Sequence, residues 1–285
     1  MAVHPSSSVQ AAREDVAGRL RDMRLDVVPK LTARALALAC GWHESKVSKV
    51  EAGKQGVSDD DIRAWCGACG TEAEADGVIR LNRRADKAYV EWRRAMRGGL
   101  TNVQHSFMPL WSRTRHFKVY EPGVIPGLCQ TASYGEAVLG MVSRFYQVTS
   151  DIAEAAAARV ARTRLLQEHG RRFAFLVEET ALRSRLGDSE MMAEQLEHLL
   201  PIVNQPNVSF GVIPMNADRP IYPVEGFWIY DDVEALVETV SAQLNLVDFH
   251  EVRLYVRTFE ELAGIAAFGA EARSLIASAR SALDS

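Results

Sequence analysis

A run of polar side chains between residues 43 and 55 has the types and spacing needed to contact duplex DNA. Lysine amines can donate to the O6 and N7 acceptors of guanine, glutamate can accept from the N4 amine of cytosine, and serine can bind bases or phosphates. Neighbouring arginine, lysine and glutamine side chains suit the phosphate backbone. The candidate DNA-binding residues are His43, Glu44, Ser45, Lys46, Ser48 and Lys49, with Arg34, Lys54 and Gln55 assigned to the backbone.

Two short helices must hold these side chains if they are to reach a groove. Thr32 is a good N-cap for a helix over 33–40, and Gly41 supplies the residue that tolerates positive φ at the turn. A second helix is expected over about 43–52, touching the first at the small Ala37. This spacing is that of a helix-turn-helix, whose second helix enters the major groove with its N-terminal residues at the base edges. The apolar positions facing the remaining helices are Leu36, Val47 and Val50.

Flanking patterns predict three more helices in this half of the chain. Apolar residues recur on one face over 9–24, and Ser58 caps a helix that runs to about residue 69 with aspartates in its first turn. A longer helix is expected over 71–97, with an apolar seam that packs either on a second copy or on its own chain. Trp42 is assigned to the core, and Glu51 to an ion pair within the domain.

Composition and charge place the chain among soluble globular proteins with two domains. The net charge is −4, yet residues 9–118 hold 20 Lys and Arg against 14 Asp and Glu, and the remainder holds 13 against 23. This asymmetry favours a front half that binds anions and an acidic rear half. No apolar run could span a membrane, no secretory leader opens the sequence, and four cysteines without a disulfide pattern suit a reducing cytosol. A cytoplasmic location without membrane contact is expected.

Motifs for catalysis or metal binding are missing from the sequence. The Cys66–Cys69 pair has no second pair or matching histidine, and the histidines show no ligand spacing. Glu178 and Glu179 are adjacent on an expected strand, so they should point to opposite faces. The sequence therefore predicts no catalytic residue, no metal ligand, no cofactor and no enzyme activity.

Beyond Gly98 and Gly99 the pattern changes to mixed strands and helices, which predicts an α+β domain. A loop rich in proline and glycine over 121–131 leads into a helix capped by Thr131. This helix start could hold the anionic group of a ligand, or the loop could simply order the fold; aromatic residues near 228 could line an apolar pocket or pack in the core. The candidate ligand or partner residues are Tyr120, Pro126, Gln130, Thr131, Tyr134 and Trp228. Strands are expected over 117–120, 172–177, 208–213, 227–230 and 235–240, and helices over 131–139, 151–169, 188–203, 247–268 and 270–282.

Both halves resemble known families. The N-terminal stretch resembles the Xre-type helix-turn-helix, although Ala33 stands where glutamine is frequent and His43 where serine or threonine usually caps. The C-terminal stretch is similar to a domain of actinobacterial Xre-type regulators described as antitoxin-like, or WhiJ-like. The first resemblance rests on Leu31-Thr32, Leu36-Ala37, Gly41, Val47-Ser48 and Glu51-Ala52-Gly53; the second on Tyr120-Glu121-Pro122, Pro126-Gly127-Leu128, Gln130-Thr131, Tyr134, Arg159 and Arg162.

The fold class expected is an all-α, lambda-repressor-like helix-turn-helix bundle followed by an α+β C-terminal domain. The domain limits expected are a disordered leader over 1–8, a DNA-binding domain over 9–70, a linker helix over 71–99 and a C-terminal domain over 100–285. The resemblance implies a transcription regulator that binds a double-stranded DNA operator as a homodimer. It also implies a C-terminal domain that binds a small-molecule effector or a small partner protein encoded nearby. Two alternatives stay open: an enzyme, or a protein-interaction (antitoxin) module, with a secondary DNA-binding head.

Overall fold

The computed structural model describes residues 7–148, 151–222 and 225–283. Contacts divide the chain into two units, one up to Val90 and one from Glu91 onward. Most of the leader expected over 1–8 lies outside the described residues, and Ser7 already begins the first helix. The domain limits expected from the sequence stay a prediction.

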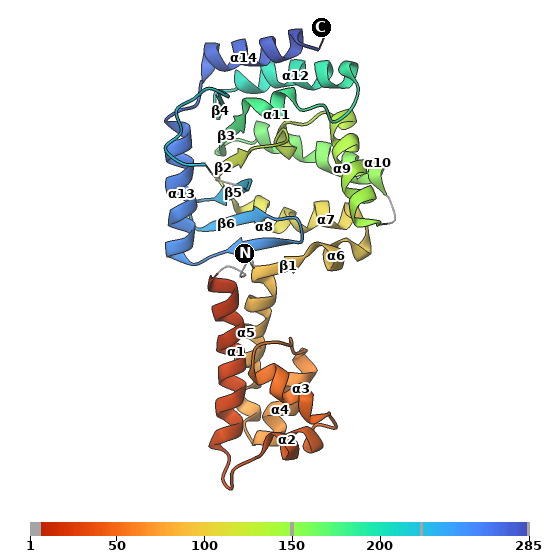
Figure 1. Ribbon diagram of the computed structural model, residues 1–285, viewed down its shortest axis with the longest axis vertical. Helices are drawn as coiled ribbons and strands as arrows, with labels where there is room; N and C mark the ends of the chain where they lie inside the picture. The colour runs from red at the N-terminus through yellow and green to blue at the C-terminus, as the bar shows by residue number, and fades with distance from the viewer. Residues whose placement is uncertain (1–6, 149–150, 223–224, 284–285) are drawn as a thin grey trace. The chain divides into compact units, whose positions relative to one another are not determined.

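Helices make up the N-terminal unit (Figure 1), and those expected over 9–24, 33–40, 43–52 and 58–69 are confirmed. A short 3-10 helix, η1 (Glu72–Glu74), and one further α-helix follow them. The helices are α1 (Ser7–Asp26), α2 (Ala33–Ala39), α3 (Glu44–Glu51), α4 (Asp59–Cys69) and α5 (Ala75–Ala88).

The core of this unit forms around Trp65 of α4, which is fully buried. Its indole Nε1 donates to the carbonyl oxygen of Leu20 on α1 at 2.9 Å. The predicted cap at Ser58 is present as a complete capping box with Asp61, which fixes where α4 begins. The buried residues packed with Trp65 include Leu20, Leu36, Val47, Val50 and Ile62.

The single helix expected over 71–97 is wrong. Helix α5 ends at Ala88 and is followed by the strand β1 (Tyr89–Glu91), the short helix α6 (Trp92–Ala95) and the 3-10 helix η2 (Met96–Gly98). The break has a long-range cause, because β1 lies beside the last strand of the sheet. The apolar seam packs on its own chain: Val78 lies in the core of the first unit and Trp92 in a cluster of the second.

The second unit is an α+β domain, as predicted, built on a seven-stranded sheet. Its order is β1-β7-β6-β5-β2-β3-β4. The strands are β2 (His116–Glu121), β3 (Arg172–Glu178), β4 (Val208–Ile213), β5 (Phe227–Tyr230), β6 (Glu234–Glu238) and β7 (Ala242–Leu246). The helices are α7 (Leu100–Ser106), α8 (Met108–Arg113), α9 (Ala132–Tyr146), α10 (Ile152–Ala161), α11 (Glu179–Arg183), α12 (Ser189–Val203), α13 (Phe249–Ala263) and α14 (Gly269–Ser281), with 3-10 helices η3 (Gly127–Cys129) and η4 (Arg162–Gln167).

The five expected strands are present, and they pair in a mixed sheet. Strands β2, β3 and β4 pair in parallel, whereas β5, β6 and β7 continue from β2 in antiparallel fashion. Strand β7 was not expected, and the helix predicted over 151–169 changes to 3-10 geometry at Arg162. Pro109 lies in the first turn of α8, which starts at Met108 after α7 has ended at Ser106.

Apolar residues cover both faces of the sheet, so helices pack on each side. Val119 and Trp228 belong to the cluster under α9, α12 and α14, whereas their neighbours Tyr120 and Phe227 belong to the cluster under α13. Figure 1 shows α13 on one side of the strands and α9 with α10 on the other.

One edge of the sheet is partly covered by the chain itself. Val212 of β4 exchanges two backbone hydrogen bonds with Ala267, in the loop between α13 and α14, at 2.9 and 2.8 Å. Gly211 beside it leaves no room for a side chain, because a Cβ there would lie 2.7 Å from atoms of Leu176 and Phe268. The opposite edge is the three-residue strand β1.

Candidate nucleic-acid interface

The turn between α2 and α3 has the geometry that the sequence predicted. Thr32 caps α2 by accepting from the backbone N–H of Ala35 at 3.1 Å. Gly41 adopts φ +71°, a conformation that glycine takes without steric cost, and the N–H of Trp42 then donates to the carbonyl oxygen of Ala37 at 2.7 Å. Because Ala37 is buried and small, α2 and α3 can approach closely there.

His43 takes the role of the serine or threonine cap that it replaces. Its Nδ1 accepts from the backbone N–H of Ser45 at 3.2 Å and lies 2.8 Å from the Ser45 hydroxyl. The first turn of α3 is therefore satisfied by a side chain. This arrangement leaves the His43 ring exposed at the start of the helix.

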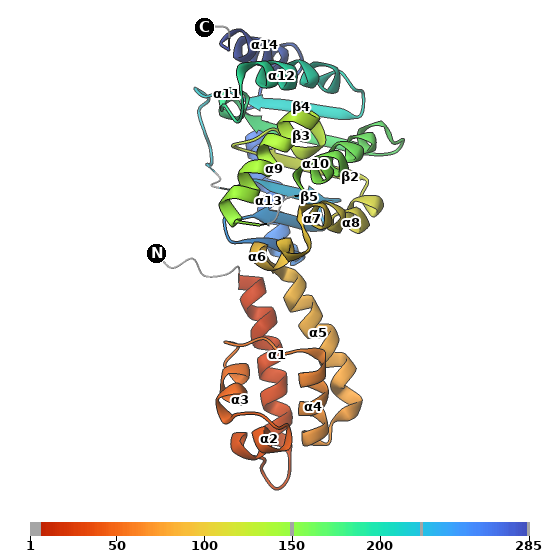
Figure 2. The same cartoon turned by 90° about the vertical axis from the view of Figure 1, so that its right-hand side faces the viewer.

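Helix α3 presents a polar outer face. Val47 and Val50 point into the core, while Glu44, Ser48 and Lys49 are exposed, as Ser45 is in the first turn. The Lys49 side chain has no hydrogen bond or ion pair within the described chain. Figure 2 places α3 and α5 on opposite sides of the N-terminal unit, so this face is not covered by α5.

Lys46 differs from the other candidates on α3 because it is already engaged. Its Nζ donates to Oδ1 of Asp61 at 2.7 Å and lies 4.0 Å from the ring centroid of Trp42. Burial alone raises the pKa of Asp61, but the hydrogen bonds from Lys46 and Ser58 outweigh it and leave that pKa below its usual value. Lys46 thus fastens α3 to α4 in the free protein.

Glu51 also has the structural role expected of it. Arg24 of α1 donates through Nε and Nη2 to its two carboxylate oxygens at 2.5 and 2.9 Å, and through Nη1 to the carbonyl oxygen of Leu31 at 2.9 Å. This bidentate geometry is the strong form of a carboxylate–guanidinium pair. It fixes the end of α3 against α1.

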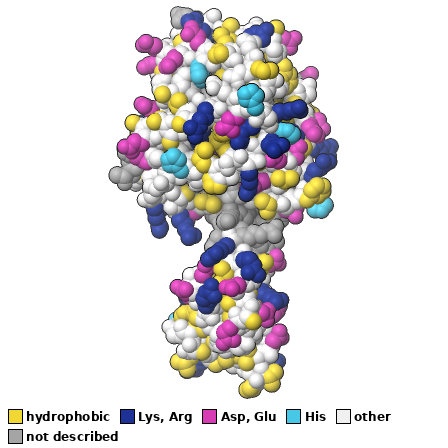
Figure 3. Space-filling model, turned by 180° about the vertical axis from the view of Figure 1, so that it is seen from behind, with side chains coloured by type: hydrophobic (Ala, Val, Ile, Leu, Met, Phe, Trp, Pro, Cys, Tyr) yellow, Lys and Arg dark blue, Asp and Glu magenta, His cyan; other side chains and the backbone are white. Residues whose placement is uncertain are grey.

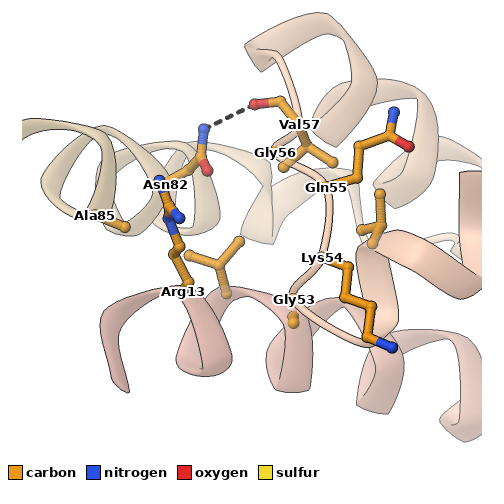
Figure 4. Close-up of a pocket in the computed structure, with 11 residues that line it drawn as sticks. Arg13, Gly53, Lys54, Gln55, Gly56, Val57, Asn82 and Ala85 are labelled. Carbon is orange, nitrogen blue, oxygen red and sulfur yellow. Dashed lines mark hydrogen bonds between the residues drawn. The ribbon is translucent and has the colours of Figure 1, made fainter. Parts of the chain in front are cut away.

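The three candidates for backbone contact are exposed around the helix pair. Arg34 lies on α2, and Lys54 and Gln55 lie in the loop after α3. That loop lines a small pocket with Arg13 of α1, and Asn82 of α5 holds it by donating to the carbonyl oxygen of Val57 at 2.9 Å (Figure 4). In the close-up Lys54 and Gln55 point away from Arg13, which leaves both side chains free to reach outward.

The charge asymmetry of the sequence is not located on the helix-turn-helix unit. Residues 1–90 contain 14 basic and 13 acidic side chains, and the surplus comes from six basic residues against one acidic residue over 91–118. Figure 3 shows basic and acidic side chains interspersed on the visible face of this unit. The expectation that the whole front half binds anions is therefore wrong. Any contact of the helix-turn-helix unit with DNA depends on a few exposed lysine and arginine side chains.

Most of the candidate ligand or partner residues of the C-terminal unit are buried and bonded to their own chain. Tyr120 donates to Glu178 at 2.8 Å, the Tyr134 hydroxyl accepts from the N–H of Ile125 at 3.2 Å, and the Gln130 amide donates to the Ile125 carbonyl at 2.7 Å. The N–H of Thr131 donates to Gln195 at 2.8 Å. Pro126 is buried too. This geometry favours the second interpretation of the loop, that it orders the fold.

Trp228 instead contacts a group of charged side chains whose proximity was not predicted from the sequence. Its Nε1 donates to Oε1 of Glu121 at 2.9 Å. Glu121 and Glu238 interact electrostatically with each other and with Arg159 of α10. We call Glu121, Glu238, Arg159 and the adjacent Arg162 the charged cluster.

Burial in the charged cluster raises the pKa of Glu121 to about 8, with a further increase from Glu238. The folded protein therefore keeps a proton that the unfolded chain releases near pH 4 to 5, so the free energy of unfolding should fall as pH rises from about 5 to about 8. Glu121→Gln should reduce this fall, as measured by urea unfolding at both ends of the range. Glu136→Gln, an exposed change on α9, is the control; an equal pH dependence in all three proteins would contradict the assignment.

Comparison with known proteins adds two family matches. A model described as a helix-turn-helix domain matches residues 15–76, and a model described as a domain of unknown function, DUF5753, matches residues 104–278. No curated protein sequence matches the chain. Within the described residues no helix is long and apolar enough to cross a membrane, and no three His, Cys, Asp or Glu side chains are grouped to hold a metal.

One solved structure with a weak similarity is that of TrmBL2, an archaeal chromatin protein reported to show a novel mode of DNA binding. The TM-score is 0.32 at 11% sequence identity, over 80% of this chain and 72% of that one. A similarity at this level has no bearing on function.

Proposed function

The chain belongs to the DUF5753 family, and we propose that it is a sequence-specific DNA-binding transcription regulator of the Xre type. The observation that carries this proposal is the exposed polar face of α3, held on a complete helix-turn-helix. Val47, Val50 and Glu51 fasten the inner side of the helix, so its outer side chains keep a fixed direction. Such a helix suits the major groove of a double-stranded operator.

The remaining parts of the proposal follow from the same resemblance. We place the protein in the cytoplasm of an actinobacterium, acting as a homodimer on paired half-sites. Its C-terminal unit has the antitoxin-like, WhiJ-like role of binding an effector or a small partner protein encoded nearby. We assign it no catalytic role.

Selection of bound sequences from a random duplex pool, followed by genome-wide mapping of the intact protein, tests the proposal. We expect one enriched motif, bound far more tightly than unrelated DNA. Because Arg34, Lys49 and Lys54 are the cations available for contact, each half-site should release about three counterions, and log affinity should fall with log salt at a slope of roughly −3 per protomer. Binding without an enriched motif would contradict sequence-specific regulation.

A further inference from the structure

Two carboxylates flank a glycine in one row across the sheet of the C-terminal unit. Val119 of β2 pairs with Trp228 of β5, which pairs with Leu236 of β6, and Tyr120, Phe227 and Val237 form the next row. Continuing this register by one residue places Glu121, Gly226 and Glu238 in one row. Alternation along a strand puts all three on the face of Trp228. A Cβ on Gly226 would lie 2.9 Å from Oε2 of Glu121, so this carboxylate lies over the glycine.

Arginine side chains from the end of α10 and the start of η4 supply the opposite charge. Arg159 lies against Gly127 and Gly135, where any added Cβ would be 3.9 and 3.8 Å from its Cδ. Its Nε and Nη1 donate to the side-chain oxygens of Gln104 and Gln130 at 3.2 and 2.9 Å. These two neutral acceptors hold the guanidinium in place without neutralising it.

Arg162 is 6% exposed and stacks on the ring of Trp111 with its guanidinium carbon 4.6 Å from the centroid. Both Nη atoms donate to Gln104, but its buried Nε has no hydrogen-bond partner. Trp111 in turn stacks on Trp228 with ring centroids 5.1 Å apart. The second arginine therefore adds another uncompensated positive charge to the same surroundings.

The acidic and basic sides of the charged cluster do not close on each other. The Glu238 side chain is exposed and has no hydrogen bond or ion pair within the described residues. The side chains of Glu121 and Arg159 are partly accessible. Opposite charges that face one another in a crowded, weakly polar environment attract strongly and normally meet in an ion pair. Within the described residues, however, no ion pair joins either carboxylate to Arg159 or Arg162.

We propose that the charged cluster binds a small zwitterion, whose ammonium lies between Glu121 and Glu238 and whose anionic group faces Arg159. This inference rests on the proposed function, because it gives the chemical class of the effector. A zwitterion matches the cluster in sign, since its ammonium would meet carboxyl groups and its anionic group would meet guanidinium groups. A ligand with only one charge would leave the opposite side of the cluster unpaired, at a cost in affinity.

Three probes with the same four-carbon skeleton test this in the full-length protein by titration calorimetry at about pH 8. They are 4-aminobutanoate, butylamine and butanoate. We expect 4-aminobutanoate to bind at least about tenfold more tightly than either analogue, because each analogue forfeits one charge-assisted contact. No binding of 4-aminobutanoate, or equal binding of all three, overturns the proposal. Preference for butanoate would indicate a simple anion site and overturns it too.

Glu238→Gln is the informative variant because it removes a charge without breaking any contact made within the described chain. It should weaken 4-aminobutanoate binding about tenfold, while Glu136→Gln on the exposed side of α9 leaves binding unchanged. Glu121→Gln, which keeps an acceptor for Trp228, provides the same test if the first variant fails to fold. Unchanged affinity in a folded variant overturns the proposal. Retained operator binding with no zwitterion binding contradicts this inference alone, whereas the reverse result contradicts the regulator function alone.

Discussion

Replacing Ser48 and Lys49 together by alanine is expected to weaken operator binding by about 100-fold or more. Both side chains lie on the exposed face of α3. The Lys49 side chain has no partner in the described chain, and the Ser48 hydroxyl only donates to the Glu44 carbonyl oxygen of its own helix at 3.5 Å, so the change removes DNA contacts at little structural cost. Each good base contact contributes about 1–3 kcal/mol of discrimination, and two together correspond to this loss. Fluorescence anisotropy with the selected operator measures the effect.

Two comparison variants separate contact from stability. Arg80→Ala removes an exposed cation from α5, on the far side of the unit, and should leave affinity within about twofold. Lys46→Ala should lower the melting temperature, because it breaks the pair with Asp61 and the contact with Trp42. If the Ser48 and Lys49 double variant bound the operator normally, α3 would not be the recognition helix.

Trp65→Ala should unfold the helix-turn-helix unit at physiological temperature. The indole is fully buried between α1 and α4 and holds the Leu20 carbonyl, and truncation of a buried tryptophan costs about 3–5 kcal/mol. That is a large part of the stability of a small helical unit. Amide hydrogen exchange should show lost protection across α1 to α5 and retained protection in strands β2 to β4.

Leu38→Ala provides the control for this loss. Leu38 is on α2 in the same unit but is 83% exposed, so its truncation removes little buried surface. Protection should stay as in the unchanged protein. Retained protection in the Trp65 variant would show that the unit is held together by other contacts than those around the indole.

The helix pair could be predicted because its signals are local. A cap at Thr32, a left-handed glycine at position 41 and buried valines at 47 and 50 act within a few residues, and each takes its expected conformation. An ion pair of Glu51 within the domain was expected, but the sequence did not identify Arg24 as its partner. The role of Lys46 could not be predicted either, because Asp61 comes from the next helix and only packing brings the two together.

Elements whose hydrogen bonds come from distant strands were predicted less well. Residues 89–91 continue the helical spacing of α5, yet they form β1 because their neighbour β7 lies about 150 residues further along the chain. Strand β7 is short, and its sequence, Ala-Gln-Leu-Asn-Leu, has only a brief alternation. The parallel direction of β2, β3 and β4 is set by the intervening helices, which periodicity does not show.

The charged cluster illustrates the same limit for a candidate site. Glu121 lies on β2, Glu238 on β6 and Gly226 directly before β5, and they come together only through the register of the sheet. Arg159 was part of the family resemblance, but nothing in its helix assigns it a partner. A glycine between two carboxylates becomes informative only when the strands are aligned.

The backbone exchange between Val212 and Ala267 restricts how two copies of this protein can assemble. It occupies hydrogen-bonding groups of β4 at the one long edge of the sheet, and the other edge offers only the three residues of β1. Templated growth into a continuous intermolecular sheet, and the aggregation that follows from it, is therefore disfavoured from the start. A symmetric dimer assembled through side chains on helices or loops, where single substitutions can tune its strength, is therefore favoured over one that extends the sheet.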